Sequence, residues 1–304
     1  MNSQPPLRHP AGLVLAGGGA LGAWQAGALL ELEAAGLRFD SVQGFSAGSI
    51  NGAAYALGVT ALAEERWAQC GTLLRLRPRL SPPAFCSNAP VWDKLDYAHD
   101  DEQARKQALC RLVVSSARWQ RDRFIYAEFD AKQGRWNGPL ASHLMASCAI
   151  PLIFPPVRLS HGGEQHVCLD GGVPTREPFS LAPLGPCEDV VVLEMVRPEE
   201  LGRRFWNPVW AIDQRGRETC RRLIDEGVAD LRRRCPRTRV FRLPPSRPLW
   251  RMLDFSPALA REGVALGRAD ARAFLGEVKL AASSACVVEP RSGTGASGRP
   301  AGST

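Results

Sequence analysis

A block of small residues near the N-terminus, Gly44-Phe45-Ser46-Ala47-Gly48, has the G-x-S-x-G form of a nucleophile elbow. In such an elbow a serine lies on a tight turn between a strand and a helix, where bulkier neighbours than glycine would clash. The helix N-terminus also favours the negative charge that develops when the serine attacks a carbonyl. Ser46 is therefore a candidate nucleophile, although a helix start capped by serine has the same pattern.

A second block, Gly17-Gly18-Gly19-Ala20-Leu21-Gly22, lies between another expected strand and helix. One interpretation is an oxyanion hole, because the amides of Gly18 and Gly19 carry no side chain that would shield them from a tetrahedral oxyanion. A tight turn without a ligand is the plainer interpretation.

The same block also satisfies the dinucleotide-binding pattern G-x-G-x-x-G through Gly17, Gly19 and Gly22, with Asp40 as the acid for the ribose. In a nucleotide-binding fold the second strand should run into that acid. Here the apolar strand follows Asp40 and ends at the serine elbow, which counts against a nucleotide-binding oxidoreductase.

A serine hydroxyl needs a base that accepts its proton. Asp170-Gly171-Gly172 follows an expected hairpin over residues 157–169, and this exit can bring a carboxylate close to a neighbouring loop. Asp-Gly is also a common turn pair, so the role of Asp170 as a base depends on its combination with the other blocks.

A histidine triad is the alternative to a serine-aspartate pair. α/β-Hydrolases carry their triad in the order serine, acid, histidine, and none of the five histidines follows Asp170. A triad would need an earlier acid and histidine, and no local pattern supports any combination of these residues: Asp122 or Asp130 with His143, His161 or His166.

Taken together, the chain resembles the patatin-like phospholipase family over about residues 11–280. Four ordered blocks carry the resemblance: GGGALG (17–22), GFSAGS (44–49), ASCAIP (146–151) and DGG (170–172). The resemblance implies a catalytic dyad of Ser46 and Asp170, an oxyanion hole from Gly18 and Gly19, and an acyl-enzyme intermediate without a metal or organic cofactor. Two departures are Leu21, where many members have a basic residue, and 173–176 (VPTR), where the family usually continues toward asparagine.

Expected strands alternate with expected helices, which favours one α/β domain with a mainly parallel sheet. The resemblance implies a three-layer sandwich. Residues 1–10 and 281–304 flank the domain over 11–280 as tails, and the second tail is expected to be disordered from about residue 290 because it has little to bury. We expect strands at 12–16, 41–45, 123–129, 189–196 and 239–243, a hairpin at 157–169 turning at 162–163, a loop at 78–90, and helices at 23–35, 47–57, 101–119, 139–148, 209–234 and 257–278.

Bulk composition limits the protein class. Apolar residues make up 45% of the chain and charged residues 23%, which suits a globular protein with a sizeable core. The N-terminus lacks the layout of a secretory signal, and the nine cysteines form no CxxC pair. We therefore expect reduced thiols, no metal site and a cytoplasmic location, with possible peripheral contact with a membrane.

The net charge of +7 suits an anionic surface, and only four of the 38 basic residues are lysine. A skewed genomic composition gives the same arginine bias. The arginine-rich helix at 209–234 would either dock on anionic lipid or present an ordinary solvated face, and the solvated face is the usual case. No nucleic-acid-binding motif is recognisable.

These observations predict a serine-dependent lipid acyl hydrolase, a carboxylic ester hydrolase of the phospholipase A type. The alternatives are an α/β-hydrolase esterase with a Ser-Asp-His triad, a nucleotide-binding oxidoreductase, and a catalytically silent lipid-binding member of the same family.

Overall fold

The computed structural model describes residues 7–285. Within them, nine strands form a central sheet whose main path runs β11-β10-β1-β2-β5-β6-β7. The first five strands of this path are parallel: β11 (Arg239–Leu243), β10 (Asp189–Leu193), β1 (Ala11–Leu15), β2 (Ser41–Phe45) and β5 (Arg111–Arg118). The antiparallel strands are β6 (Phe124–Asp130), β7 (Arg135–Trp136), β8 (Val157–His161) and β9 (Glu164–Leu169).

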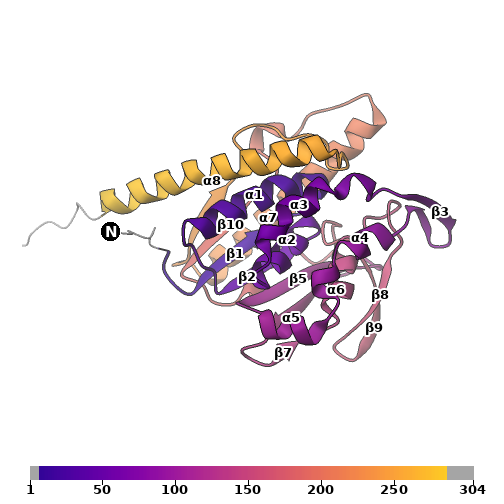
Figure 1. Cartoon of the computed structure of the whole chain (residues 1–304), viewed down its shortest axis with the longest axis horizontal. Helices are drawn as coiled ribbons and strands as arrows, with labels where there is room; N and C mark the ends of the chain where they lie inside the picture. Colours follow the sequence, from indigo (N-terminus) through magenta and orange to yellow (C-terminus); the bar gives the residue numbers. More distant parts are fainter. Residues whose placement is uncertain (1–6, 286–304) are drawn as a thin grey trace, which may run out of the picture.

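Helices cover both faces of the sheet (Figure 1). Alternate residues of a strand point to opposite faces, and in β1 Leu13 and Leu15 pack into one core cluster while Val14 packs into the other. The first cluster includes helices α1 (Gly22–Ala34), α2 (Ala47–Ala56) and α8 (Pro257–Ala285); the second includes α7 (Pro208–Arg234). The three-layer α/β prediction is confirmed.

The strand register brings the candidate site together at one edge of the sheet. Leu15 pairs with Gly44, so the loops that follow β1 and β2 leave the sheet at the same level. Strand β9 runs antiparallel to β5, and Leu169 pairs with Ala117 near the carboxyl end of β5. The residue after Leu169 therefore enters the region of the serine elbow.

Two predictions about the middle of the chain are wrong. The expected helix over 101–119 is helix α5 (Asp101–Gln107) followed by strand β5, because the apolar, partly β-branched run at 112–117 is buried on both faces of the sheet. The expected loop over 78–90 contains the second strand pair, β3 (Leu76–Leu80) and β4 (Pro83–Cys86), and the start of α4 (Ala89–Asp93).

The other expected elements lie close to their predicted bounds. Helices α3 (Ala63–Ala68) and α6 (Leu140–Ser147) complete the set, and α3 was not expected. Helix α8 extends to Ala285, and the predicted disordered tail from about residue 290 lies outside the described residues. Among helices of the described part, none combines the length and the apolar character that a membrane span requires.

Candidate active site

Ser46 lies on a strained turn between β2 and α2. Its backbone angles are φ 53° and ψ −131°, a conformation that non-glycine residues rarely adopt. A Cβ atom at Gly44 would lie 2.5 Å from the carbonyl oxygen of Gly48, and one at Gly48 would overlap the carbonyl oxygen of Leu15. Both glycines are thus needed for the close packing that holds the serine at the start of α2.

The Ser46 hydroxyl donates a hydrogen bond to Oδ2 of Asp170 at 2.7 Å. The other carboxylate oxygen, Oδ1, accepts from the Gly172 amide at 2.6 Å. Burial raises the pKa of Asp170 to about 7, and these two hydrogen bonds only partly oppose the rise. A carboxylate with a pKa near neutrality is well suited to accept and return a proton.

A second serine, Ser147 at the end of α6, connects the elbow to the acid loop. Its hydroxyl accepts from the Ser46 amide at 2.9 Å and donates to the carbonyl of Ser115 at 2.6 Å. Its carbonyl accepts from the Gly171 amide at 3.1 Å, and the Asp170 amide donates to Ala149 at 2.9 Å. Sequence reasoning included Ser147 in the 146–151 block but assigned it no role.

The glycine loop lies against the elbow. A Cβ atom at Gly17 would approach the Ser46 Cβ to 3.0 Å. Within the described residues, the amides of Gly18 and Gly19 have no hydrogen-bond partner, whereas the next amide, Ala20, donates to the carbonyl of Met252 at 2.7 Å. Two unpaired donors therefore lie in the loop that packs beside Ser46.

Met252 fixes the position of this loop. Gly19 has φ +55°, and a Cβ atom there would overlap the Met252 carbonyl oxygen, so only glycine fits. No sequence signal indicated Met252, because it follows Gly19 by more than two hundred residues and belongs to no motif.

The dinucleotide arrangement is absent from the described structure. Asp40 lies at the start of β2, where its carboxylate accepts from the Ala11 amide at 2.7 Å and contacts His9 at 2.7 Å. The glycine loop lies at the opposite edge, after the end of β1. In a dinucleotide fold the acid and the glycine loop share the carboxyl edge of the sheet.

The structure does not bring a histidine to Ser46 either. His143 is buried, with its ring 5.6 Å from Phe129 and 6.0 Å from His161, and burial lowers its pKa to about 4. Among the hydrogen bonds of residues 7–285, none joins a histidine to Ser46 or Asp170.

The acids proposed for a triad have other partners. Asp122 accepts from Arg118 at 2.9 Å, and Asp130 accepts from the Gln133 amide at 3.0 Å. His166 lies on β9, with its ring 6.5 Å from that of His161. The triad geometry is therefore not formed.

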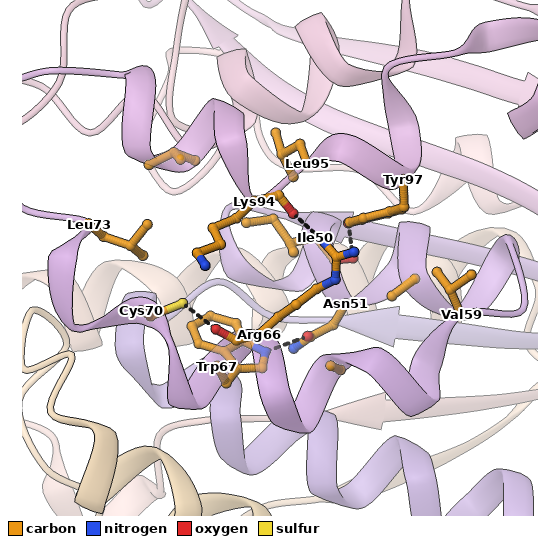
Figure 2. Close-up of a pocket in the computed structure, with 13 residues that line it drawn as sticks. Ile50, Asn51, Val59, Arg66, Trp67, Cys70, Leu73, Lys94, Leu95 and Tyr97 are labelled. Carbon is orange, nitrogen blue, oxygen red and sulfur yellow. Dashed lines mark hydrogen bonds between the residues drawn. The ribbon is translucent and has the colours of Figure 1, made fainter.

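An apolar cavity of about 50 Å³ lies beside helix α2 (Figure 2). Ile50, one turn after Ser46, lines it, and Asn51 links its wall to the glycine block by donating to the Gly22 carbonyl at 2.9 Å. Trp67 in turn donates to Asn51 at 3.0 Å. Since a cavity needs about 10–15 Å³ of such space to hold one water molecule, this one has room for only a few water molecules.

The arginines of α7 are largely engaged in ion pairs. Arg217 is buried and pairs with Glu200 at 2.8 Å and with Asp213 at 2.7 Å. Arg221 pairs with Glu194 and Asp225, each at 3.0 Å. The interpretation of this helix as a solvated face is wrong at these two positions, where the guanidinium groups hold α7 against neighbouring segments.

Both departures from the resemblance begin at a core position, although Pro174 and Arg176 of the second are exposed. Leu21 is fully buried and Val173 is 7% exposed, so apolar packing occupies both positions. The eight cysteines in the described part are free thiols, and no three histidine, cysteine or acidic residues of that part converge as metal ligands.

A family model described as patatin-like phospholipase matches residues 13–182. No curated protein matches. The structure of VipD from Legionella pneumophila is similar with a TM-score of 0.45 and 13% identity, covering 89% of this chain and 67% of that one. The structure of the type III effector protein ExoU is similar with a TM-score of 0.40 and 15% identity, covering 90% of this chain and 54% of that one. A structure of ExoU in complex with SpcU from Pseudomonas aeruginosa is similar with a TM-score of 0.37 and 18% identity, covering 90% of this chain and 53% of that one. This chain therefore spans about half the length of the matched ExoU chains.

Proposed function

Because the chain belongs to the patatin-like phospholipase family, we propose that it is a serine-dependent lipid acyl hydrolase that cleaves carboxylic esters through an acyl-enzyme. The hydrogen bond of 2.7 Å from the Ser46 hydroxyl to the buried carboxylate of Asp170 carries this proposal. It pairs a serine in a strained conformation at the start of α2 with a base, beside two glycine amides that are available as donors.

In the first half of the reaction, Ser46 Oγ attacks the acyl carbonyl carbon while Asp170 Oδ2 takes the hydroxyl proton. The amides of Gly18 and Gly19 donate to the oxyanion of the tetrahedral intermediate. The C–O bond to the alcohol then breaks, and the proton held by Asp170 passes to the leaving oxygen. This leaves the acyl group esterified to Ser46 and Asp170 ionised again.

In the second half, a water molecule gives a proton to Asp170 and attacks the acyl carbon. The same amides stabilise the second oxyanion, and collapse of the intermediate returns the proton to Ser46 Oγ and releases a carboxylic acid. One base serves both halves because Asp170 gives up its proton at the end of each half and is then ionised again. No step needs a metal or organic cofactor.

Active-site labelling tests the proposal directly. A fluorophosphonate probe should label the wild-type protein, and Ser46→Ala should abolish both labelling and ester turnover while the protein stays folded. Ser160→Ala, which removes an exposed hydroxyl on β8, is the matched control and should retain both. Undiminished turnover by purified Ser46→Ala would refute the role of this serine.

The base assignment has its own test, which separates a dyad from a triad. Asp170→Asn should lower kcat by several orders of magnitude, because an amide cannot accept the serine proton. Single replacements of His143, His161 and His166 should cost little rate. A histidine variant as inactive as Ser46→Ala, alongside an active Asp170→Asn, would support the triad instead.

A further inference from the structure

All residues of strand β3 are exposed, including its two leucines. Leu76 is 77% and Leu80 96% accessible. The pairing register shifts between Leu76 and Arg79, so Leu80, which pairs with Pro83, shares a face with Phe85, whose side chain is 57% exposed, and Leu76 lies on the other face with Arg79. Within the described part of the chain β3 pairs with β4 alone. Isolated two-stranded hairpins are marginal in water, so these exposed apolar side chains are suited to contact something beyond the chain.

A second exposed apolar segment covers residues 201–212, before and at the start of α7. Trp206 is fully exposed, at 104%, and Val209 and Ile212 are 55% and 69% exposed. Arg203 and Arg204 lie in the same segment, before Trp206, and are also exposed. Large apolar side chains grouped with arginine in this way are typical of a surface that meets an interface between water and lipid.

The β3–β4 hairpin is attached to the loop that holds the acid. The Phe85 amide of β4 donates to the Leu152 carbonyl at 2.8 Å, and Leu152 is itself 56% exposed. Three residues earlier, Ala149 accepts the backbone hydrogen bond from Asp170. The hairpin is labelled at β3 in Figure 1, where it projects from the end of the molecule opposite the N-terminus.

The 201–212 segment and α7 are attached to the glycine loop in a similar way. The Arg251 guanidinium lies 5.6 Å from the centre of the Trp210 ring. The next residue, Met252, donates its amide to the Asp213 carboxylate at 2.6 Å, and its carbonyl accepts from the Ala20 amide. The two exposed segments therefore contact the loops on either side of the Ser46–Asp170 pair.

Taking the proposed function as its basis, we propose that the β3–β4 hairpin and residues 201–212 together form a docking surface for an anionic lipid bilayer. Charge decides between a bilayer and a second copy of the chain. In the described part, no carboxylate lies within 4.0 Å of the guanidinium groups of these exposed arginines: Arg75, Arg77, Arg79, Arg203 and Arg204. A symmetric dimer through this surface would bring these cations near their own copies, whereas anionic headgroups would neutralise them.

The docking surface would lie in the headgroup region without crossing the bilayer. The outer edge of β3 carries unpaired backbone groups, which the hydrocarbon core cannot satisfy. Leucine, valine, isoleucine and tryptophan side chains would enter the boundary with the acyl chains, and the arginines would stay among the phosphates. Such docking would place the ester bonds of the lipid at the loops that hold Ser46 and Asp170.

Binding can be measured apart from hydrolysis by using the Ser46→Ala protein with vesicles of phosphatidylcholine, with and without phosphatidylglycerol. Leu76→Ser with Leu80→Ser should weaken sedimentation with anionic vesicles by about tenfold per leucine. Arg77→Gln with Arg79→Gln should weaken it by about fivefold per arginine and reduce its salt dependence.

Matched controls come from the opposite edge of the sheet. Leu109, just before β5, is 58% exposed, and Arg232 and Arg237 are exposed near the C-terminal end of α7. Leu109→Ser and the double variant Arg232→Gln with Arg237→Gln should bind vesicles as the parent protein does. If these controls lose as much affinity as the β3 variants, binding depends on overall composition and charge, and the docking surface is refuted.

Trp206 supplies an independent readout of the second segment. Its emission should shift to shorter wavelength on addition of anionic vesicles, and the shift should be much smaller in Trp206→Phe. Unchanged vesicle binding by the Leu76 and Leu80 double variant would overturn the proposal. Loss of a dimer in that variant, with vesicle binding intact, would assign the surface to a second copy of the chain instead.

Turnover of a short, soluble ester distinguishes failure of this inference from failure of the proposed function. This reaction needs no lipid surface, so the β3 variants made with Ser46 intact should retain it while losing hydrolysis of vesicle lipids. A protein that binds vesicles through β3 but turns over no ester would refute the hydrolase and leave the docking surface. A protein that turns over the soluble ester but still binds and hydrolyses vesicle lipids equally well after these substitutions would refute the docking surface and leave the hydrolase.

Discussion

Replacing Asp170 by asparagine should stabilise the folded protein above neutral pH even as it removes the activity. Burial raises the pKa of Asp170 from its ordinary value of 3.8 to about 7. The folded state thus holds more protons than the unfolded state between these pH values, and its stability falls as pH rises through that window. At 1.36 kcal/mol per pKa unit, the ionised carboxylate costs about 4 kcal/mol above pH 7 and almost nothing below pH 4.

Asparagine should remove this cost without losing the local hydrogen bonds. Its oxygen can accept from the Gly172 amide, and its NH₂ group can donate to the Ser46 hydroxyl, which then acts as acceptor. Thermal unfolding of both proteins between pH 4 and pH 9 should show a difference in Tm that grows with pH. The full difference corresponds to a rise of up to roughly 8 °C.

A buried carboxylate outside the site serves as the control for this experiment. Asp270 accepts from Trp24 at 2.7 Å and from the Ser246 amide at 3.0 Å. Asp270→Asn should not reproduce the stabilisation that increases with pH. If Asp170→Asn is equally destabilising at every pH, the carboxylate is not desolvated as the structure indicates, and the argument for its role as a neutral-pH base is refuted.

The same carboxylate should give kcat/KM an acid limb near pH 7, falling about tenfold per pH unit below it, because protonated Asp170 cannot accept the serine proton; a pH–rate profile flat from pH 5 to pH 8 would contradict this. Gly19→Ala should lower kcat about a hundredfold by displacing the loop from Met252. The control Gly163→Ala, at a positive φ but with open space around it, should leave kcat nearly unchanged. Equal kcat values for the two variants would show that the glycine loop donates no hydrogen bond to the oxyanion. Arg217→Met should lower the free energy of unfolding by about 3–5 kcal/mol, measured by denaturant titration, because it leaves the buried carboxylate of Glu200 unpaired; a loss near zero would refute that role.

The elements around the site could be predicted because their sequence constraints are local. Strand β2 ends where Gly44 and Gly48 allow the elbow to close, and the 162–163 glycines reverse the chain between β8 and β9 with φ of +60° and +81°. Both patterns depend on backbone conformations that few residues other than glycine adopt.

Strand β5 was wrongly predicted as part of a helix because its conformation depends on tertiary contacts and not on a local sequence pattern. Residues 101–107 do form a helix, capped by the Asp100 side chain, which accepts from the Gln103 amide at 3.0 Å. The following run is a central strand because β2 and β6 pair with its two edges, and the core clusters on either side of the sheet bury its two faces. A strand buried on both faces has no alternating polarity that would separate it from a buried helix.

The position of the glycine loop depends on residues that no local pattern reveals. The family match ends at residue 182, yet the Met252 carbonyl holds the Ala20 amide and excludes a side chain at Gly19. Arg217 donates to the Leu249 carbonyl at 3.1 Å, so the same buried guanidinium that pairs with acids also positions the segment leading to Met252. The motifs supply the donors, and a segment far along the chain fixes where they point. Because the contacts of Met252 with Gly19 and Ala20 join residues more than two hundred positions apart, the geometry of the proposed oxyanion hole follows from the closed fold and could not be derived from the motif alone.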